Sequence, residues 1–224
     1  MISPVHELFA AQEPGWSLLQ LGGLGHSLIE FCGPALRAGA ALAVHAEPHA
    51  VTDTEWAGLR GRAGVAADDP ALRTGAVDIT DSRALAWEWP RADVVVAAQL
   101  FAQHDPLPVL QTLSGFARRH LVIATNLLPP EDGIEDGAML PGFLPDARLR
   151  AVEAILLRRG VGLVQFNTPP ARLDPGGRAY WPGMWEWFMT RGALDAMLAD
   201  LGWRVVAQQS VWLELGQVLI AERL

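Results

Sequence analysis

"LLQLGGLGHSLIEF", residues Leu18 to Phe31, is the stretch that decides the fold of this 224-residue chain. An apolar run typical of a buried strand ends in three glycines within four residues, Gly22, Gly23 and Gly25, and a helical pattern follows. Glycine lets the backbone turn sharply and approach a ligand closely. The stretch therefore predicts a strand, a turn that binds a ligand, and then a helix.

The same alternation of strands and helices continues along the first half of the chain. Apolar runs without a regular polar alternation are typical of parallel strands whose sheet is covered on both faces. We therefore predict an α/β fold built on a doubly wound, mostly parallel sheet. The expected strands are 17–22, 40–47, 75–79, 92–99 and 120–126, and the expected helices are 26–39, 52–64 and 105–119.

The second half of the chain has a different composition. Residues 127–188 contain a loop rich in Pro, Gly and acidic side chains, a helix at 146–160 and a Trp-rich region. A helix is expected at 190–203. The two strands that follow it join at Gly216, which predicts a closing antiparallel pair. We expect one domain, 1–224, in which 127–188 form a lid over a small-molecule site.

Composition and charge exclude several kinds of function. The net charge is −8, which argues against a nucleic-acid partner because phosphates bind to basic surfaces. The chain has no lysine, so a Schiff base, a pyridoxal site and a Walker lysine are excluded. Its one cysteine, Cys32, excludes an intramolecular disulfide, a cysteine-rich zinc site and an iron–sulfur cluster held by several thiolates.

Nothing in the sequence predicts a membrane location. No apolar run reaches the roughly 18 residues that a membrane span needs. The first residues lack the basic start and apolar block of a signal peptide. We therefore expect a cytoplasmic protein with no membrane partner, and the sequence is compatible with a homodimer.

The glycine-rich turn allows three interpretations from local motifs alone. A dinucleotide fingerprint, G-x-G-x-x-G, lacks its third glycine because Leu28 stands there. A hydrolase elbow, G-x-S-x-G, would use Ser27, but it lacks the last glycine and follows the first strand, too early for that fold. The third is a tight turn that binds nothing.

The order of the whole chain is more informative. A strand, a Gly-rich turn, a helix and a second strand ending in an acid, here Glu47, resemble class I S-adenosylmethionine-dependent methyltransferases. A third strand ends in an acid at Asp78, with Asp81 as its rival, and "ADVVVAAQLFAQH" supplies Asp93 and His104. The aromatic segment, the "TRGALDAMLADLGW" helix and the closing strands have the same form, so the resemblance covers roughly 16–224.

The resemblance implies a Rossmann-like fold, S-adenosyl-L-methionine as the cofactor, and a ribose held by Glu47. One departure is that Gln20 stands where the family usually has Asp or Glu before its glycines. A glutamine carbonyl still accepts hydrogen bonds from the cofactor's ammonium group, but without a full charge. The implied cofactor-binding residues are Gln20, Gly22, Gly23, Gly25, Glu47, Asp78, Ile79 and Gln99.

Methyl transfer to an oxygen, nitrogen or carbon of a small molecule is the activity that the resemblance implies. His104 is the candidate general base, with a histidine packed on the sheet as the alternative. Aromatic side chains suit a flat substrate or a sulfonium. Two other functions stay open: a binding or scaffold protein that no longer methylates, and a cofactor-assisted rearrangement or cyclisation. The candidate substrate-binding residues are Asn126, Tyr180, Trp181 and Trp185.

Two acidic or histidine-containing stretches were weighed as metal sites. His45, Glu47 and His49 alternate and would share one face of a strand, but Pro48 interrupts that strand. The segment "PPEDGIEDG" lacks a recognised calcium spacing. We therefore predict no metal site.

Overall fold

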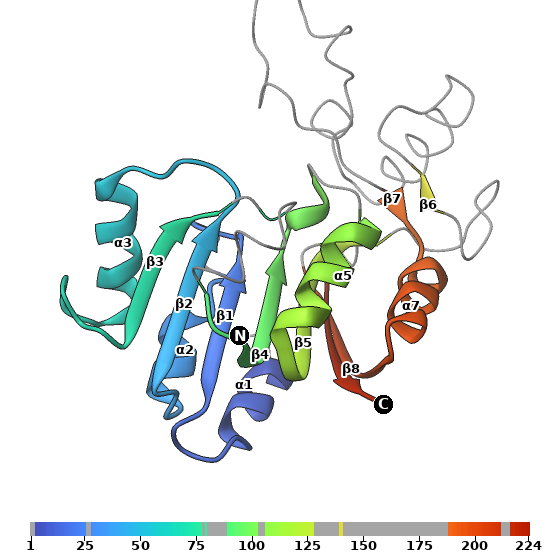
Figure 1. The fold of residues 1–224 in the computed structure, drawn as a ribbon, viewed down its shortest axis with the longest axis horizontal. Coiled ribbons are helices and arrows are strands. Elements are labelled where there is room, and N and C mark those ends of the chain that lie inside the picture. Colours follow the sequence, from blue (N-terminus) through green and yellow to red (C-terminus); the bar gives the residue numbers. More distant parts are fainter. Residues whose placement is uncertain are drawn as a thin grey trace, which may run out of the picture.

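The computed structural model describes residues 3–25, 28–77, 79, 89–102, 106–127, 139–140, 188–211 and 216–224. Its main feature is a seven-stranded sheet in the order β3-β2-β1-β4-β5-β9-β8 (Figure 1). The strands are β1 (Ser17–Leu21), β2 (Leu42–Glu47), β3 (Leu72–Ala76), β4 (Ala92–Ala98), β5 (Ala117–Asn126), β8 (Trp203–Val211) and β9 (Gly216–Arg223). The helices are α1 (Ser3–Ala10), α2 (Cys32–Arg37), α3 (Asp53–Ala63), η1 (Leu100–Ala102), α5 (Pro106–Phe116) and α7 (Arg191–Asp200).

The first five strands of this sheet run parallel. β1 pairs with both β2 and β4, and the sheet extends to β3 on one side and to β5 on the other. β9 then pairs antiparallel with β5, and β8 pairs antiparallel with β9. The structure confirms the predicted doubly wound, mostly parallel sheet with a C-terminal antiparallel pair.

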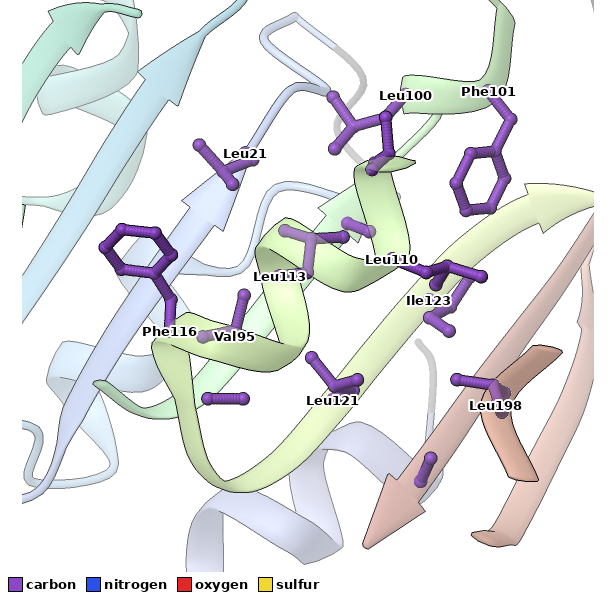
Figure 2. Packing of buried hydrophobic residues seen from close by; sticks show 14 of the residues in the cluster. Leu21, Val95, Leu100, Phe101, Leu110, Leu113, Phe116, Leu121, Ile123 and Leu198 are labelled. Atoms are coloured by element: carbon purple, nitrogen blue, oxygen red, sulfur yellow. The ribbon is translucent and has the colours of Figure 1, made fainter. Parts of the chain in front are cut away.

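Two hydrophobic clusters cover the two faces of the sheet. One contains side chains of α1, α2 and α3, and the other contains side chains of α5 and α7. Figure 2 shows the second cluster, in which Leu110, Leu113 and Phe116 of α5 pack over Val95 and Leu121. Because both faces are buried, β1, β2, β4 and residues 121–124 of β5 are mostly apolar.

Helix α3 forms as its terminal residues predict. The Thr52 hydroxyl accepts a hydrogen bond from the Glu55 backbone nitrogen, and the Glu55 carboxylate accepts one from the Thr52 backbone nitrogen. This capping box satisfies two backbone donors at the start of the helix. Gly64 ends the helix in the left-handed conformation, at φ +76°.

The helix predicted at 26–39 is shorter in the structure. Residues 28–30 are not helical, and α2 begins only at Cys32. The side chain of Gln20 bonds to the backbone of Ile29 and Phe31, which holds this segment in an irregular conformation. Tertiary hydrogen bonds therefore override the local helical pattern.

Two further element boundaries differ from prediction, and one helix is additional. The helix predicted at 105–119 ends at Phe116, and Arg118 and Arg119 are exposed residues of β5. The third strand is Leu72–Ala76 rather than 75–79, because this edge strand tolerates polar side chains on its uncovered face. Helix α1 was not predicted.

Some predictions lie outside the described residues. The helix at 146–160 is among them, and so is most of the expected lid, 127–188. Two short strands of this region are described, β6 (Met139–Leu140) and β7 (Phe188–Met189), and they form a separate antiparallel pair. No helix in the described part of the chain is both long enough and apolar enough to cross a membrane.

Candidate functional site

The candidate site lies where β1, β2 and β4 end, at the middle of the sheet. β1 is flanked by β2 on one side and by β4 on the other, so the chain connections diverge between β1 and β4. Crevices beyond the carboxyl ends of strands at such switch points are the usual ligand sites of open α/β sheets. The glycine-rich turn, Glu47 and Gln99 each follow or end one of these three strands.

The glycine-rich turn presses against the end of β4. Gly22, Gly23 and Gly25 have φ angles of +77°, +84° and +83°, which favour glycine. A Cβ at Gly22 would lie 2.4 Å from the Ala98 carbonyl oxygen, and one at Gly23 would lie 2.7 Å from the Ala98 Cβ. Gly25 has no such neighbour within 4 Å. Packing thus requires the first two glycines, while the backbone conformation alone requires the third.

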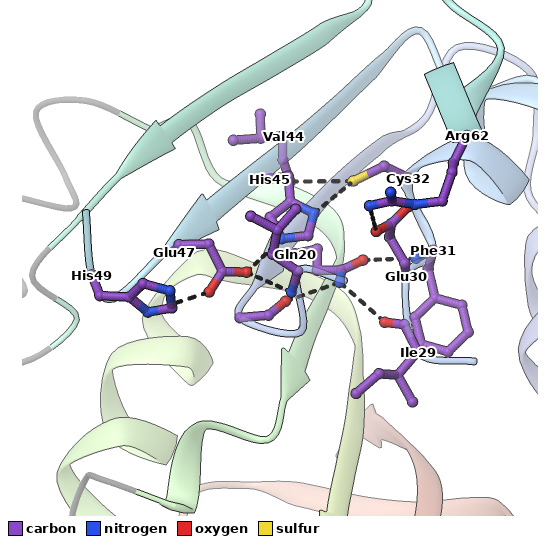
Figure 3. Close-up of polar contacts among 12 residues, drawn as sticks. Gln20, Ile29, Glu30, Phe31, Cys32, Val44, His45, Glu47, His49 and Arg62 are labelled. Carbon is purple, nitrogen blue, oxygen red and sulfur yellow. Dashed lines mark hydrogen bonds and ion pairs between the residues drawn. The ribbon is translucent and has the colours of Figure 1, made fainter. Parts of the chain in front are cut away.

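The side chain of Gln20 connects the start of this loop to its end through hydrogen bonds (Figure 3). Its Nε2 donates to the carbonyl oxygens of Gly22 and Ile29, each at 3.0 Å, and its Oε1 accepts from the Phe31 nitrogen at 2.8 Å. The residue is fully buried. An amide satisfies this set of partners because it carries both a donor and an acceptor. In the structure Gln20 therefore holds the turn, and its expected direct contact with a cofactor stays a prediction.

Glu47 connects the end of β2 to the same turn. Its Oε1 accepts a hydrogen bond from the Leu24 backbone nitrogen at 2.8 Å and lies 2.7 Å from His45 Nε2. Its Oε2 lies 3.8 Å from Nδ1 of the exposed His49, too far for a hydrogen bond. The Glu47 side chain is only 3% exposed. The turn and the carboxylate that were expected to share a site are thus joined directly.

His45 is a part of this site that the sequence did not identify as such. Its side chain is fully buried, with Nδ1 3.9 Å from Cys32 Sγ and its ring edge-on to Trp56 at 5.8 Å. The available signal was the alternation of His45 with Glu47 on β2, which had suggested only a metal site. In the described part of the chain, no group of three or more His, Cys, Asp or Glu side chains could hold a metal ion.

The other predicted residues in the described regions lie at or near the same edge. Gln99 follows β4 with a φ of +56°, a conformation that is rare for residues other than glycine and is often found at functional sites. Ile79 is 2% exposed and packs in the core, and Asn126 is the last residue of β5. Five candidates lie outside the described residues and stay predictions: Asp78, His104, Tyr180, Trp181 and Trp185.

No protein-family model matches this chain, and no curated protein matches it. Comparison with solved structures gives many matches.

The magnesium protoporphyrin IX methyltransferase of Synechocystis PCC 6803, with bound S-adenosylhomocysteine (SAH), has a TM-score of 0.59 and 16% identity over 99% of this chain and 81% of its own. The 1,6-didemethyltoxoflavin-N1-methyltransferase of Burkholderia thailandensis, also with bound SAH, gives 0.58 and 16% over 98% and 76%. The mitomycin 7-O-methyltransferase MmcR has a TM-score of 0.54 and 18% identity. That match covers 99% of this chain but only 53% of MmcR. The chain therefore has the fold of S-adenosylmethionine-dependent methyltransferases.

Proposed function

We propose that this protein transfers a methyl group from S-adenosyl-L-methionine to an oxygen, nitrogen or carbon of a small molecule. The observation that carries the proposal is the buried Glu47 carboxylate at the end of β2, bonded to the glycine-rich turn after β1. Both features lie at the switch point of a sheet whose fold is shared with SAH-bound methyltransferases.

The chemistry of these groups fits the cofactor. A ribose presents two hydroxyl donors, and among the described residues no hydrogen bond reaches Glu47 Oε2, so this oxygen can accept from them. The turn of Gly22, Gly23 and Gly25 brings backbone rather than side chains to the neighbouring position. Asp78 and Ile79 would then border the adenine, as the resemblance implies, and Gln99 would be a further cofactor contact.

When bound, the cofactor supplies the methyl group on its sulfonium. The chain has to hold the acceptor in line with that group and exclude water, which accounts for much of the rate gain in such reactions. His104 would take the acceptor's proton where one is lost. Asn126, Tyr180, Trp181 and Trp185 would line the acceptor position, and 127–188 would cover it.

Calorimetric titration with S-adenosylmethionine and with SAH tests the proposal. The wild-type protein should bind both ligands. Glu47→Ala should raise the dissociation constant about ten- to hundredfold, because charge-assisted hydrogen bonds contribute roughly 1.5–3 kcal/mol. Glu222→Ala is the matched control, since it removes an exposed carboxylate of β9 far along the sheet.

Two results would contradict the proposal. Wild-type protein that binds neither ligand would indicate a scaffold that has lost the cofactor. An unchanged dissociation constant in Glu47→Ala, with wild-type binding intact, would remove Glu47 from the site. Release of SAH from S-adenosylmethionine in the presence of heteroaromatic acceptors would then separate methyl transfer from binding alone.

A further inference from the structure

We propose that His45 is a positioning residue, which fixes the Glu47 carboxylate so that one defined oxygen faces the ligand. This inference rests on the proposed function, because it concerns how the same carboxylate receives the cofactor's hydroxyl groups. It gives a role to a buried histidine that neither the motif order nor the fold accounts for.

The geometry forms a continuous chain of contacts behind the site (Figure 3). Cys32 of α2 lies 3.9 Å from His45 Nδ1, His45 Nε2 lies 2.7 Å from Glu47 Oε1, and Leu24 N donates to that same oxygen. His45 and Glu47 alternate on β2, so both side chains lie on the face covered by α2 and α3. One carboxylate oxygen thus has two partners from the protein.

The contacts also fix which ring nitrogen carries hydrogen. An ionised carboxylate only accepts hydrogen bonds, so Nε2 of His45 must be the donor. Nδ1 faces the Cys32 sulfur at 3.9 Å. Burial, with a smaller effect of the Glu30 charge, raises the pKa of the Cys32 thiol, which therefore keeps its proton. That proton has two acceptors within reach, Nδ1 of His45 and the Val44 carbonyl oxygen at 3.8 Å. The hydrogen on Nε2 thus follows from the contact with Glu47 alone.

The arrangement resembles a Cys–His–Glu catalytic triad in order but not in access. Cys32 and His45 are both fully buried, beneath α2 and α3, and no substrate can reach the sulfur. A thiol with a raised pKa is also a poor nucleophile. Positioning is thus the role left for His45.

The consequence for the ligand concerns the two oxygens of Glu47. Oε1 contacts His45 and Leu24, whereas Oε2 points toward the exposed side chain of His49 and makes no hydrogen bond to it. Trp56 packs edge-on against the imidazole and limits its rotation. A carboxylate held in this way loses less conformational freedom when a diol binds, which favours binding.

The test combines binding with a spectroscopic readout. His45→Phe keeps a ring but removes the donor to Oε1, and we expect it to weaken SAH binding about tenfold, the equivalent of one hydrogen bond. His45→Gln retains a donor and should restore part of that loss. Val44→Ala is the control, because Val44 is equally buried on β2 but packs on the opposite face. It should lower the melting temperature and leave the SAH affinity within about twofold.

The second readout uses the ligand-free wild-type protein. Nitrogen-15 NMR of the imidazole should show hydrogen on Nε2 of His45, and its shift should change in Glu47→Gln. Hydrogen on Nδ1 instead would overturn the inference. So would unchanged SAH affinity in His45→Phe, or an equal loss in Val44→Ala, while wild-type binding stands. Wild-type protein that fails to bind SAH would overturn the proposed function itself, which is a different result.

Discussion

Two regions of the sheet place polar side chains in opposite ways: the carboxyl ends of β1 and β2 (the polar end) and the β8–β9 hairpin at the sheet's edge. At the carboxyl ends of β1 and β2, Gln20, His45 and Glu47 are buried, and each has defined hydrogen-bond partners. In the β8–β9 hairpin, by contrast, side chains along β8 alternate between inside and outside, and pairs such as Arg204–Glu222 lie at the surface.

This difference separates what the fold needs from what a site needs. Burying a polar group is unfavourable unless it is hydrogen-bonded, so a sheet built for stability alone would place apolar side chains there. The hairpin places mostly apolar side chains on its inner face, with Gln209 Oε1 as a buried polar atom that has no hydrogen-bond partner among the described residues, and its role is to complete the sheet. The carboxyl ends of β1 and β2 instead bury three polar side chains, Gln20, His45 and Glu47, as expected if these residues support ligand binding. Four predictions test this comparison.

The largest effect on stability should come from the hairpin. Trp203 at the start of β8 is 1% exposed, its Nε1 donates to Ser114 Oγ at 2.8 Å, and Arg223 lies over its ring. Trp203→Ala should lower the free energy of unfolding by about 3–5 kcal/mol, as large aromatic truncations in cores do. Urea unfolding measures this loss. The SAH affinity of the folded protein should stay the same. A loss of affinity as well would show that the β8–β9 hairpin also supports binding.

Gln20→Leu should affect both stability and binding. The substitution leaves three backbone groups of the loop without their partners, those of Gly22, Ile29 and Phe31. Such groups cost roughly 1–3 kcal/mol each when left buried, and water that enters the loop offsets part of this, so we expect a loss of about 2–4 kcal/mol. SAH binding should fall at least tenfold, because the turn loses its support.

Gln20→Glu sharpens the same test. It restores the acid that the methyltransferase pattern usually has, but its carboxylate would face the carbonyl oxygens of Gly22 and Ile29. We expect this variant to be destabilised and to bind SAH no better than wild type. Tighter binding by Gln20→Glu would show that the amide is not needed for the loop.

The thiol at the polar end should make stability depend on pH in the alkaline range. Burial, and then the Glu30 charge, raise the pKa of Cys32 above its ordinary value of 9.0. Because the folded-state pKa is the higher one, the thiol's contribution is complete below about pH 9 and falls as the pH rises above it. The slope is about 1.4 kcal/mol per pH unit, so roughly 1 kcal/mol is lost by pH 10.

Unfolding in urea at pH 8 and pH 10 measures this dependence. Cys32→Ala is the control, because it removes the titrating group and should show a smaller loss between the two pH values. Equal losses in both proteins would mean that the thiol ionises in the folded state as it does in the unfolded one.

The smallest effect is expected at the surface of the hairpin. Arg204→Ala removes the ion pair with Glu222, whose side chains are 64% and 38% exposed. Exposed pairs contribute about 0–1 kcal/mol and are screened by salt, so the melting temperature should change little. Thermal unfolding at low and high salt would check this, and a loss comparable with that of Gln20→Leu would show that the hairpin also depends on its polar groups.

The sequence predicted the strands best where both sides of the sheet are covered. β4 is apolar after Asp93, and β1, β2 and β5 each contain a core-facing apolar run, because helices bury both of their faces. β3 was placed about three residues too late, since Arg73 and Thr74 of this edge strand do not look like part of a buried run. The start of α2 was wrong because contacts from Gln20, distant in sequence, decide it.

The candidate site was predictable only in its outline. The positions of the glycine-rich turn and of Glu47 follow from chain order, because parallel strands bring their carboxyl ends to one edge. The bond from Leu24 to Glu47 and the role of His45 depend on how a loop folds over β2, which no local pattern encodes. His45 stands out in the sequence only as a candidate metal ligand beside Glu47, and the sequence predicts no metal site there.

The strand order has one consequence for how the protein is made. β8 pairs only with β9, and β9 lies between β8 and β5 although it is the later of the two in sequence. During synthesis, the five parallel strands can assemble while β8 still has no strand to join. β8 has its pairing strand only after β9 has emerged, so the edge that carries the candidate site can form before the closing hairpin is added.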